Sequence, residues 1–291
     1  MIWVLLLTGA VSMSSESLSK ADVEIANQSI VGCLDNMSRL RSGECRVTGS
    51  ISGQVGAGMS SRIDVYTAFD LNAQRIRFDD LTPDQGGLLM GGRYIRDGQR
   101  SFVSAGETPR AIVQSLASSP PHAAIEVFDI RSIGLFSMRS YVSISSHEEF
   151  FENLAAKDLT VVERQGSLVK LRFDDKAGFF TELWLDAKKG FSWVKYRVSS
   201  SAQPIDIDID IETSWGDFNN VWAPVSVRIS DKQGVGTQEV HLSVEWEKVN
   251  EMIAAALFEP ESLASKESVG LYSNELGGAL LFLRTINDTR Q

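Results

Sequence analysis

Chemistry near neutral pH would come most readily from the three histidines of the chain, which are His122, His147 and His241. A nucleophilic triad needs a histidine that is held by a carboxylate. His241 falls in an alternating run and is predicted to face solvent, and His122 lies in a predicted loop. His147 stands beside two glutamates in the first turn of a predicted helix. That pair could bind a metal weakly, but acidic residues in a first turn are typical of helix stabilisation.

Four acidic residues, Asp206, Asp208, Asp210 and Glu212, alternate with isoleucines and suggest a metal site. Calcium needs six or more oxygen ligands that converge from a curved loop. A strand instead spreads its same-face carboxylates ~6.5–7 Å apart, which is twice the rise per residue. We therefore predict a solvent-facing ladder whose charges discourage edge pairing. The opposite face would then point to the core or a cavity, with Ile205, Ile207, Ile209 and Ile211.

Cys33 and Cys45 are the two cysteines of the chain. An even count in an exported protein favours one disulfide, which would tie the end of a predicted N-terminal helix to the first predicted strand. Closing so short a loop would stabilise the fold by ~3 kcal/mol at most. The alternative is two buried free thiols, and the spacing does not match a zinc site.

Other signatures of catalysis and of nucleic-acid binding are missing from the sequence. The glycines at 53, 56 and 58 lack the Lys-Ser/Thr that completes a phosphate loop, and no nucleophile-elbow pentapeptide occurs. The formal charge of −10, from 38 acidic and 28 basic residues, argues against nucleic acid and against an anionic membrane surface. We therefore predict a protein that is not an enzyme and needs no cofactor.

The spacing of apolar residues indicates the elements that carry these side chains. Residues 16–42 have apolar positions at intervals of three and four, which predicts a helix ending at Ser42-Gly43. From Glu44 onward the period is two, which predicts strands, and Asp97-Gly98 is a strong hairpin signal. At 43% hydrophobic residues the chain can bury a sizeable core. We expect an α+β fold built on an antiparallel meander.

The middle of the chain breaks the strand pattern. Residues 108–145 contain three prolines and a mixed apolar stretch, so we predict an insertion of short helices or loop. Ser146 and Glu149 then form a capping box, which predicts the start of a helix.

The two ends of the chain have different expected roles. Residues 1–15 begin with an apolar run followed by small and polar residues, as in a secretory signal, although no Lys or Arg precedes the run. We expect a periplasmic or secreted protein; a buried first helix or strand is the alternative. No stretch reaches the ~20 apolar residues of a transmembrane span. We expect one domain at 16–260 with an insertion near 108–157, and a C-terminal tail at 261–291.

Five short motifs occur in a recognisable order along these elements. They are Arg75-Ile76-Arg77-Phe78, Tyr94-Ile95-Arg96-Asp97-Gly98-Gln99-Arg100-Ser101-Phe102, Glu182-Leu183-Trp184-Leu185-Asp186, Val221-Trp222-Ala223-Pro224 and Leu257-Phe258-Glu259-Pro260. Together they resemble the LolA-type lipoprotein-carrier and RseB-like superfamily over roughly residues 16–260. The resemblance implies an incomplete β-barrel with an apolar concave face, N-terminal and mid-chain helices as a lid, and no catalytic residues. The long middle segment and the tail depart from the carrier pattern.

The resemblance also implies an apolar ligand, either a lipid or the acyl chain of a lipoprotein, on the concave face. Positions that could line such a site are Val65, Ile76, Phe78, Phe102, Leu171, Phe180, Leu183 and Val194. From the alternation alone, the same residues could equally fill a solid core. The second functional hypothesis is an envelope protein-interaction or sensor module that uses residues 108–145 and exposed strand edges, with no small ligand.

Overall fold

The computed structural model of the 291-residue chain describes most of the expected strands and the N-terminal helix. The described residues are 19–53, 61–81, 92–105, 110–115, 130–135, 150–151, 154, 157–175, 178–200, 207–233, 236–263, 269–276 and 279–286. The signal-like segment 1–15, His122 and His147 lie outside these ranges.

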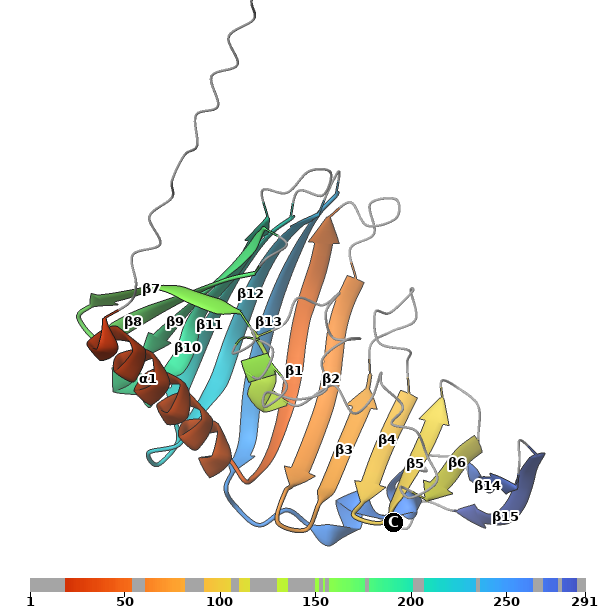
Figure 1. The fold of residues 1–291 in the computed structure, drawn as a ribbon. Helices are drawn as coiled ribbons and strands as arrows, with labels where there is room; N and C mark the ends of the chain where they lie inside the picture. The colour runs from red at the N-terminus through yellow and green to blue at the C-terminus, as the bar shows by residue number, and fades with distance from the viewer. Residues whose placement is uncertain are drawn as a thin grey trace, which may run out of the picture.

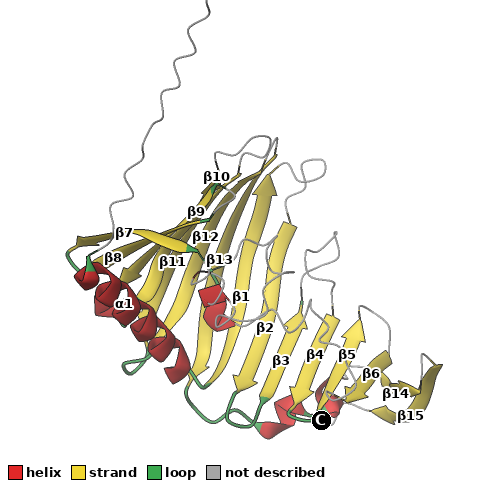
Figure 2. Cartoon of the chain, viewed as in Figure 1, coloured by secondary structure: helices red, strands yellow, loops and turns green. Residues whose placement is uncertain are grey.

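Within the described residues, fifteen strands form one sheet, which accounts for most of the described fold (Figures 1 and 2). In chain order they are β1 (Ser42–Gly53), β2 (Ser61–Asp70), β3 (Arg75–Asp80), β4 (Gly92–Asp97), β5 (Arg100–Ala105), β6 (Arg110–Ser115), β7 (Asp158–Gln165), β8 (Leu168–Asp174), β9 (Phe179–Asp186), β10 (Ser192–Ser200), β11 (Ile207–Asp217), β12 (Trp222–Gln233), β13 (Gly236–Val249), β14 (Val269–Leu276) and β15 (Ala279–Ile286).

The strands are arranged in the order β15-β14-β6-β5-β4-β3-β2-β1-β13-β12-β11-β10-β9-β8-β7. Neighbours are antiparallel throughout, except that β14 runs parallel to β6. β1 and β13 pair in the middle, so the two halves of the meander close on each other through strands far apart in sequence. The sheet is open and curved, as Figure 1 shows, which confirms the predicted curved antiparallel sheet.

The N-terminal helix α1 (Lys20–Arg39) begins with a capping box. The Ser19 hydroxyl accepts a hydrogen bond from the Asp22 backbone N–H at 3.2 Å, and the Asp22 carboxylate accepts one from the Ser19 backbone N–H at 3.3 Å. The predicted end at Ser42-Gly43 is wrong, because Leu40 already leaves the helical region and Ser42 starts β1.

The sheet has two chemically different faces, because successive side chains of a strand point in opposite directions. We call the concave face, on which α1 lies, the inner face, and the other the outer face (Figure 1). The helix buries Cys33, Met37 and Leu40 in the same hydrophobic cluster as the inner side chains of the strands. Its Asn36 Nδ2 donates to Ser192 Oγ at 3.0 Å and to the Trp222 carbonyl at 3.3 Å, which fixes α1 over the beginnings of β10 and β12.

Two short 3-10 turns, η4 (Ala255–Phe258) and η5 (Pro260–Leu263), cover part of the outer face of β2 to β6. They form a second hydrophobic cluster with the outward side chains of those strands. Its members are Ala68, Ile95, Phe102, Ala111, Val113, Ile253, Phe258, Leu263 and Leu271. From the predicted tail, β14 and β15 then extend the sheet beyond β6.

The middle segment contributes more to the sheet than its composition indicated. The prediction of short helices or loop is wrong at β6, because β5 and β14 supply hydrogen-bonding partners on both of its sides. Further on, η1 (Ile130–Ser132) is a 3-10 turn, as predicted for a short helix. Phe150, Phe151 and Leu154 are helical and buried, in agreement with the predicted helix, but a lid of helices stays a prediction.

The Asp97-Gly98 hairpin is confirmed between β4 and β5. Gly98 has φ of 91°, a conformation that residues with a side chain rarely adopt. The Asp97 carboxylate accepts hydrogen bonds from the backbone N–H groups of Gln99 at 3.0 Å and Arg100 at 2.8 Å. A short polar side chain and a glycine therefore fix the register of this hairpin.

Candidate binding face

The inner face of β8 to β13 is mostly apolar, although by register it also carries four buried polar residues, Thr181, Thr213, Asp231 and Gln238. On β11 the apolar side chains are Ile207, Ile209 and Ile211, which confirms the predicted inward direction of the isoleucines within the described residues. Ile211 lies opposite Tyr196 of β10 on one side and Ile229 of β12 on the other. The register continues this apolar face through Leu183 and Leu171, which are directly opposite each other on β9 and β8.

Five of the eight predicted ligand-contacting residues share this inner face. Val65, Ile76 and Phe78 lie on the inner side of β2 and β3, and Leu171 and Leu183 on that of β8 and β9. A sixth residue, Val194, sits at a β-bulge in β10 and is half-buried against the same cluster.

The prediction that Phe102 and Phe180 line the concave face is wrong, because both side chains point to the outer face. Phe102 is directly opposite Ile95 and belongs to the outer cluster under η4 and η5. Phe180 is directly opposite Asp174, and the Arg172 guanidinium lies 4.4 Å from the centre of its ring. Neither ring can contact a ligand on the inner face without leaving its strand position.

The predicted Cys33–Cys45 disulfide is absent, since both residues are free and buried thiols. Residues on either side of Cys33 in α1 contact the beginning of β10, where Gly32 lies against Phe191 and Asn36 bonds Ser192. Cys45 lies in β1, which is four strands away along the sheet. Burial raises the pKa of both thiols, so they are protonated and poorly nucleophilic at neutral pH.

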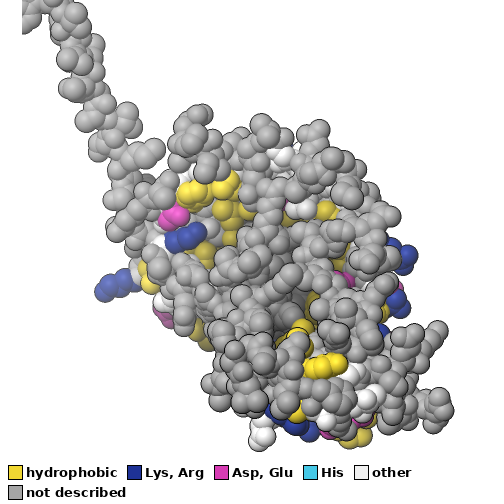
Figure 3. All heavy atoms as spheres, turned by 90° about the vertical axis from the view of Figure 1, so that its right-hand side faces the viewer, with side chains coloured by type: hydrophobic (Ala, Val, Ile, Leu, Met, Phe, Trp, Pro, Cys, Tyr) yellow, Lys and Arg dark blue, Asp and Glu magenta, His cyan; other side chains and the backbone are white. Residues whose placement is uncertain are grey.

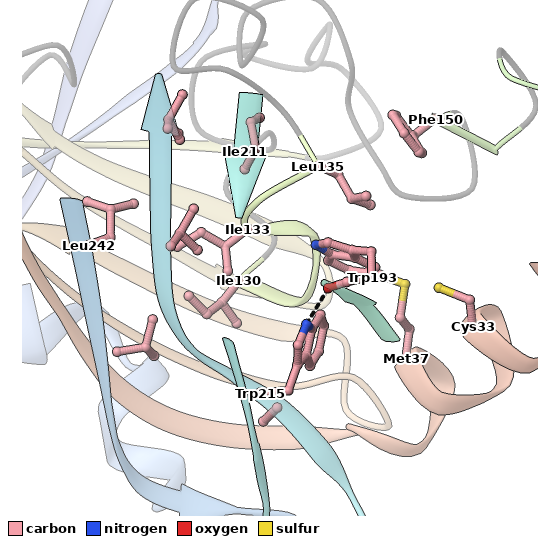
Figure 4. Close-up of a cluster of buried hydrophobic side chains, with 14 of the residues drawn as sticks. Cys33, Met37, Ile130, Ile133, Leu135, Phe150, Trp193, Ile211, Trp215 and Leu242 are labelled. Atoms are coloured by element: carbon pink, nitrogen blue, oxygen red, sulfur yellow. Dashed lines mark hydrogen bonds between the residues drawn. The ribbon is translucent and has the colours of Figure 1, made fainter. Parts of the chain in front are cut away.

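Two tryptophans at the base of the inner face were not foreseen from the sequence. Trp193 and Trp215 make an edge-to-face pair with ring centres 4.6 Å apart, and Trp215 Nε1 donates a hydrogen bond to the Trp193 carbonyl (Figure 4). Each lies at a β-bulge, where the alternation of the strand slips by one residue. A strict two-residue rhythm therefore misses them, and only their size indicated that they would be buried.

Residues 130–135 lie against these tryptophans and against β12 (Figure 4). Ile130, Ile133 and Leu135 from this segment are almost completely buried in the inner cluster. The described cover of the inner face thus includes α1 and this short segment. Their contribution to the face follows from no periodicity in the sequence.

The outer face of β8 to β13 is charged, as the acidic ladder predicted. Lys195 Nζ lies 2.8 Å from the Asp210 carboxylate and 3.7 Å from that of Glu212, and Arg197 lies 3.2 Å from Asp208. A polar depression of about 310 Å³ is lined there by Lys195, Asp208, Asp210, Glu212, Arg228, Ser230, Lys232 and Glu239. Such a lining of mixed charge does not suit an acyl chain. Viewed from the side of β14 and β15, hydrophobic side chains show in the middle of the molecule and Lys and Arg mostly at its margins (Figure 3).

A charged group at the centre of the outer face links β1, β2 and β13. Lys248 Nζ and the Tyr66 hydroxyl both donate to the Glu44 carboxylate, at 2.7 Å and 2.6 Å. Burial acts to raise the pKa of Glu44, but the hydrogen bonds from Lys248 and Tyr66 outweigh it, so its pKa lies below the usual value. The Arg46 guanidinium likewise lowers the pKa of Asp64.

These two lowered pKa values predict a loss of stability in acid. A carboxyl whose pKa is lower in the folded than in the unfolded protein contributes stability above its unfolded pKa, and loses it as the pH falls through the folded pKa. We expect the free energy of unfolding to fall below about pH 4.5, and Glu44→Gln to make that fall less steep. Urea unfolding measured from pH 7 to pH 2.5 checks this, with Glu163→Gln on the exposed β7 as a matched loss of one charge. An unchanged acid slope in Glu44→Gln would contradict the assignment.

The described residues contain neither a metal-binding cluster nor a histidine on the inner face. Among them, no three His, Cys, Asp or Glu side chains are grouped closely enough to hold a metal ion. His241 is exposed on the outer side of β13, which confirms its predicted direction. None of the described helices has the length and apolar character needed to cross a bilayer.

Comparisons with known proteins give remote structural likenesses. No family model matches the chain, and no curated protein matches it by sequence. A LolA superfamily protein from Nitrosomonas europaea aligns over 81% of this chain and 99% of its own, at 10% identity and a TM-score of 0.44. A DUF1329 family protein from Desulfovibrio piger covers 84% and 98% at 10% identity and a TM-score of 0.43. The Mycobacterium tuberculosis lipoprotein LppX covers 78% and 95% at 14% identity and a TM-score of 0.27. One of these solved structures is described as a LolA superfamily protein, which is the superfamily that the five sequence motifs resemble.

Proposed function

We propose that this protein is an exported, non-enzymatic binding protein for the acyl chain of a lipid or lipoprotein, which it holds on the inner face of its sheet. The observation that carries the proposal is the contrast between the two faces of β8 to β13. Isoleucines 207, 209 and 211 line the inner side, and Asp208, Asp210 and Glu212 line the outer side of the same strand. On β11 an apolar ligand can therefore be desolvated on the inner side without contacting these three carboxylates, although Asp231 of β12 is buried on the same face opposite Ile209.

The energetics of an acyl chain suit a long apolar face. Each methylene removed from water contributes ~0.8 kcal/mol, so a chain that buries about ten of them gains roughly 8 kcal/mol before the cost of association. Leu171, Leu183, Tyr196 and Ile211 follow one another across four strands. Leu171, Leu183 and Ile211 are fully covered in this structure, so an acyl chain would contact them by taking the place of side chains that now cover them. Val65, Ile76 and Phe78 would extend this contact on the other half of the sheet.

The described part of the chain supplies little that could catalyse a reaction. Both thiols are buried and protonated, and His241 faces solvent away from the proposed site. The groups that face the acyl site on β8 to β11 are mainly hydrocarbon and aromatic. These observations support binding as the activity of this face.

Quenching of tryptophan fluorescence by dibromostearate tests the proposal, because bromine quenches indoles only at short range. We expect saturable quenching of the wild-type protein. We expect Trp215→Phe, on the inner face, to lose a large part of the quenched signal. The matched control is Trp184→Phe, whose ring lies on the outer face between Lys170 and Lys195 and should not affect the quenched fraction. Quenching that Trp184→Phe removes, or no saturable binding of any acyl probe, would overturn the proposal and favour a protein partner.

A further inference from the structure

Residues 130–135 pack on the inner face through their side chains and belong to none of the described strands. Three apolar side chains of this segment, Ile130, Ile133 and Leu135, are buried at 2%, 0% and 0% exposure. Within the described residues, the segment contacts β12 through η1 and approaches Trp193 and Thr213 through Gly134. The segment therefore packs on the inner face in the same hydrophobic cluster as Trp193, Ile211 and Trp215 (Figure 4).

Gly134 brings the backbone of this segment directly over two polar side chains. Its φ is 85°, which favours glycine. A Cβ at this position would collide with Thr213 Oγ1 and would lie 3.3 Å from Trp193 Nε1. Both atoms are buried, and the backbone at Gly134 lies close against Thr213, so displacing the segment would open a path to them.

The polar atoms under the segment have no hydrogen-bonding partner. Among the described residues, Trp193 Nε1 and Thr213 Oγ1 under the segment are buried and make no hydrogen bond, and neither does Ser132 Oγ of the segment itself. An indole N–H can only donate, whereas a hydroxyl can donate or accept. Buried polar groups are almost always satisfied, so these unpaired groups favour a state in which something replaces the segment.

We propose that Trp193 and Thr213 form a recognition point for the carbonyl of an acyl ligand, and that the ligand takes the place of residues 130–135. This inference rests on the proposed function and names its ligand class: an acyl chain attached through an ester or an amide. The carbonyl oxygen accepts hydrogen bonds from the Trp193 N–H and the Thr213 hydroxyl. Neither residue is charged, so we expect a neutral carbonyl to bind here more tightly than an ionised carboxylate. Trp193 and Thr213 supply no cation to offset the free energy of desolvating a carboxylate. Ile133 and Leu135 leave the apolar space that the chain enters.

Two lipids that differ only in the carbonyl test this directly. They are 1-palmitoylglycerol and its ether analogue 1-O-hexadecylglycerol, measured by displacement of dibromostearate. We expect the wild type to bind the ester about five to ten times more tightly. In Thr213→Val, which keeps the shape of the side chain, and in Trp193→Phe, which keeps most of the ring, that preference should fall to below about twofold while ether binding persists. Ser214→Val, at the exposed neighbouring position of β11, is the matched control and should keep the preference.

The outcomes separate the two proposals. If neither lipid binds to the wild type, the proposed function fails and this inference fails with it. If both bind but the ester preference is absent, or survives in Thr213→Val, the acyl site stands and the carbonyl point is wrong. Thr213→Val should also keep or raise the melting temperature, because it removes an unpaired buried hydroxyl. It therefore remains informative even if Trp193→Phe does not fold.

Gly134→Ala tests displacement of the segment independently. A side chain at φ of 85° that also collides with Thr213 disfavours the seated segment, so we expect both lipids to bind several times more tightly. Unchanged or weaker binding of both lipids, in a variant whose far-UV circular dichroism matches that of the wild type, would contradict competition between the segment and the ligand.

Discussion

Replacing Arg77 with methionine is expected to lower the free energy of unfolding by about 3–5 kcal/mol, because it breaks a buried ion pair and leaves one charge behind. Arg77 and Asp79 are 3% and 7% exposed, and Arg77 Nη2 lies 2.7 Å from the Asp79 carboxylate. The same guanidinium donates to the carbonyls of Leu257 at 3.0 Å and Ser262 at 3.2 Å. Its loss would therefore also release η4 and η5 from the outer face.

Urea unfolding of single and double variants measures this effect. In Arg77→Met/Asp79→Asn no unpaired charge remains, so the loss should be clearly smaller than the sum of the two single losses. Arg46→Met is the matched control, since Arg46 pairs with Asp64 at 2.7 Å but its side chain is 48% exposed. We expect the control to cost far less than Arg77→Met. If Arg77→Met and Arg46→Met lowered the free energy of unfolding equally, the contacts of Arg77 with Asp79, η4 and η5 would not be buried in solution.

Replacing Ile211 with aspartate is expected to cost more than about 4 kcal/mol, because it removes a buried side chain and places a carboxylate in an apolar site. Ile211 is 0% exposed and is flanked by Tyr196 and Ile229. The variant should unfold, or fold only at low pH where the new carboxyl is protonated. Thermal unfolding between pH 5 and pH 8 checks this expectation.

The matched control for Ile211→Asp lies on the opposite side of the same strand. Ser214 is exposed on the outer face, so Ser214→Asp should change the stability by no more than about 0.5 kcal/mol. Similar effects at the two positions would contradict the division of β11 into an apolar and a charged side, on which the proposed ligand site depends.

The alternation of apolar and polar residues was enough to predict most strands between Glu44 and Lys248 and the direction of the acidic ladder, and the Asp97-Gly98 pair predicted the hairpin between β4 and β5. These features depend on neighbours in sequence, and the two-residue period of a strand fixes them locally. It also contained a signal that the predicted site ignored. Phe180 and Leu183 are three positions apart in one strand, so their side chains must point to opposite faces.

The remaining features depend on contacts between distant parts of the chain. Phe102 is a core residue, as its place in the alternation indicated, but it belongs to the hydrophobic cluster on the outer face. That cluster is completed by η4 and η5, which follow more than 150 residues later in the chain. The cysteine count favoured a disulfide, yet the helix carries Cys33 toward β10 and the chain carries Cys45 into β1. Trp193, Trp215 and residues 130–135 were missed because bulges and a 3-10 turn have no regular period.

The position of a bound acyl chain tests the central claim most directly. A crystal structure of the protein with dibromostearate, with the bromine atoms located by anomalous scattering, would give that position. We expect bromine on the inner face between α1 and the strands β10 to β12, within contact of Tyr196 or Ile211. Bromine in the charged depression lined by Lys195 and Arg228, or elsewhere on the outer face, would contradict the assignment of the inner face as the binding site.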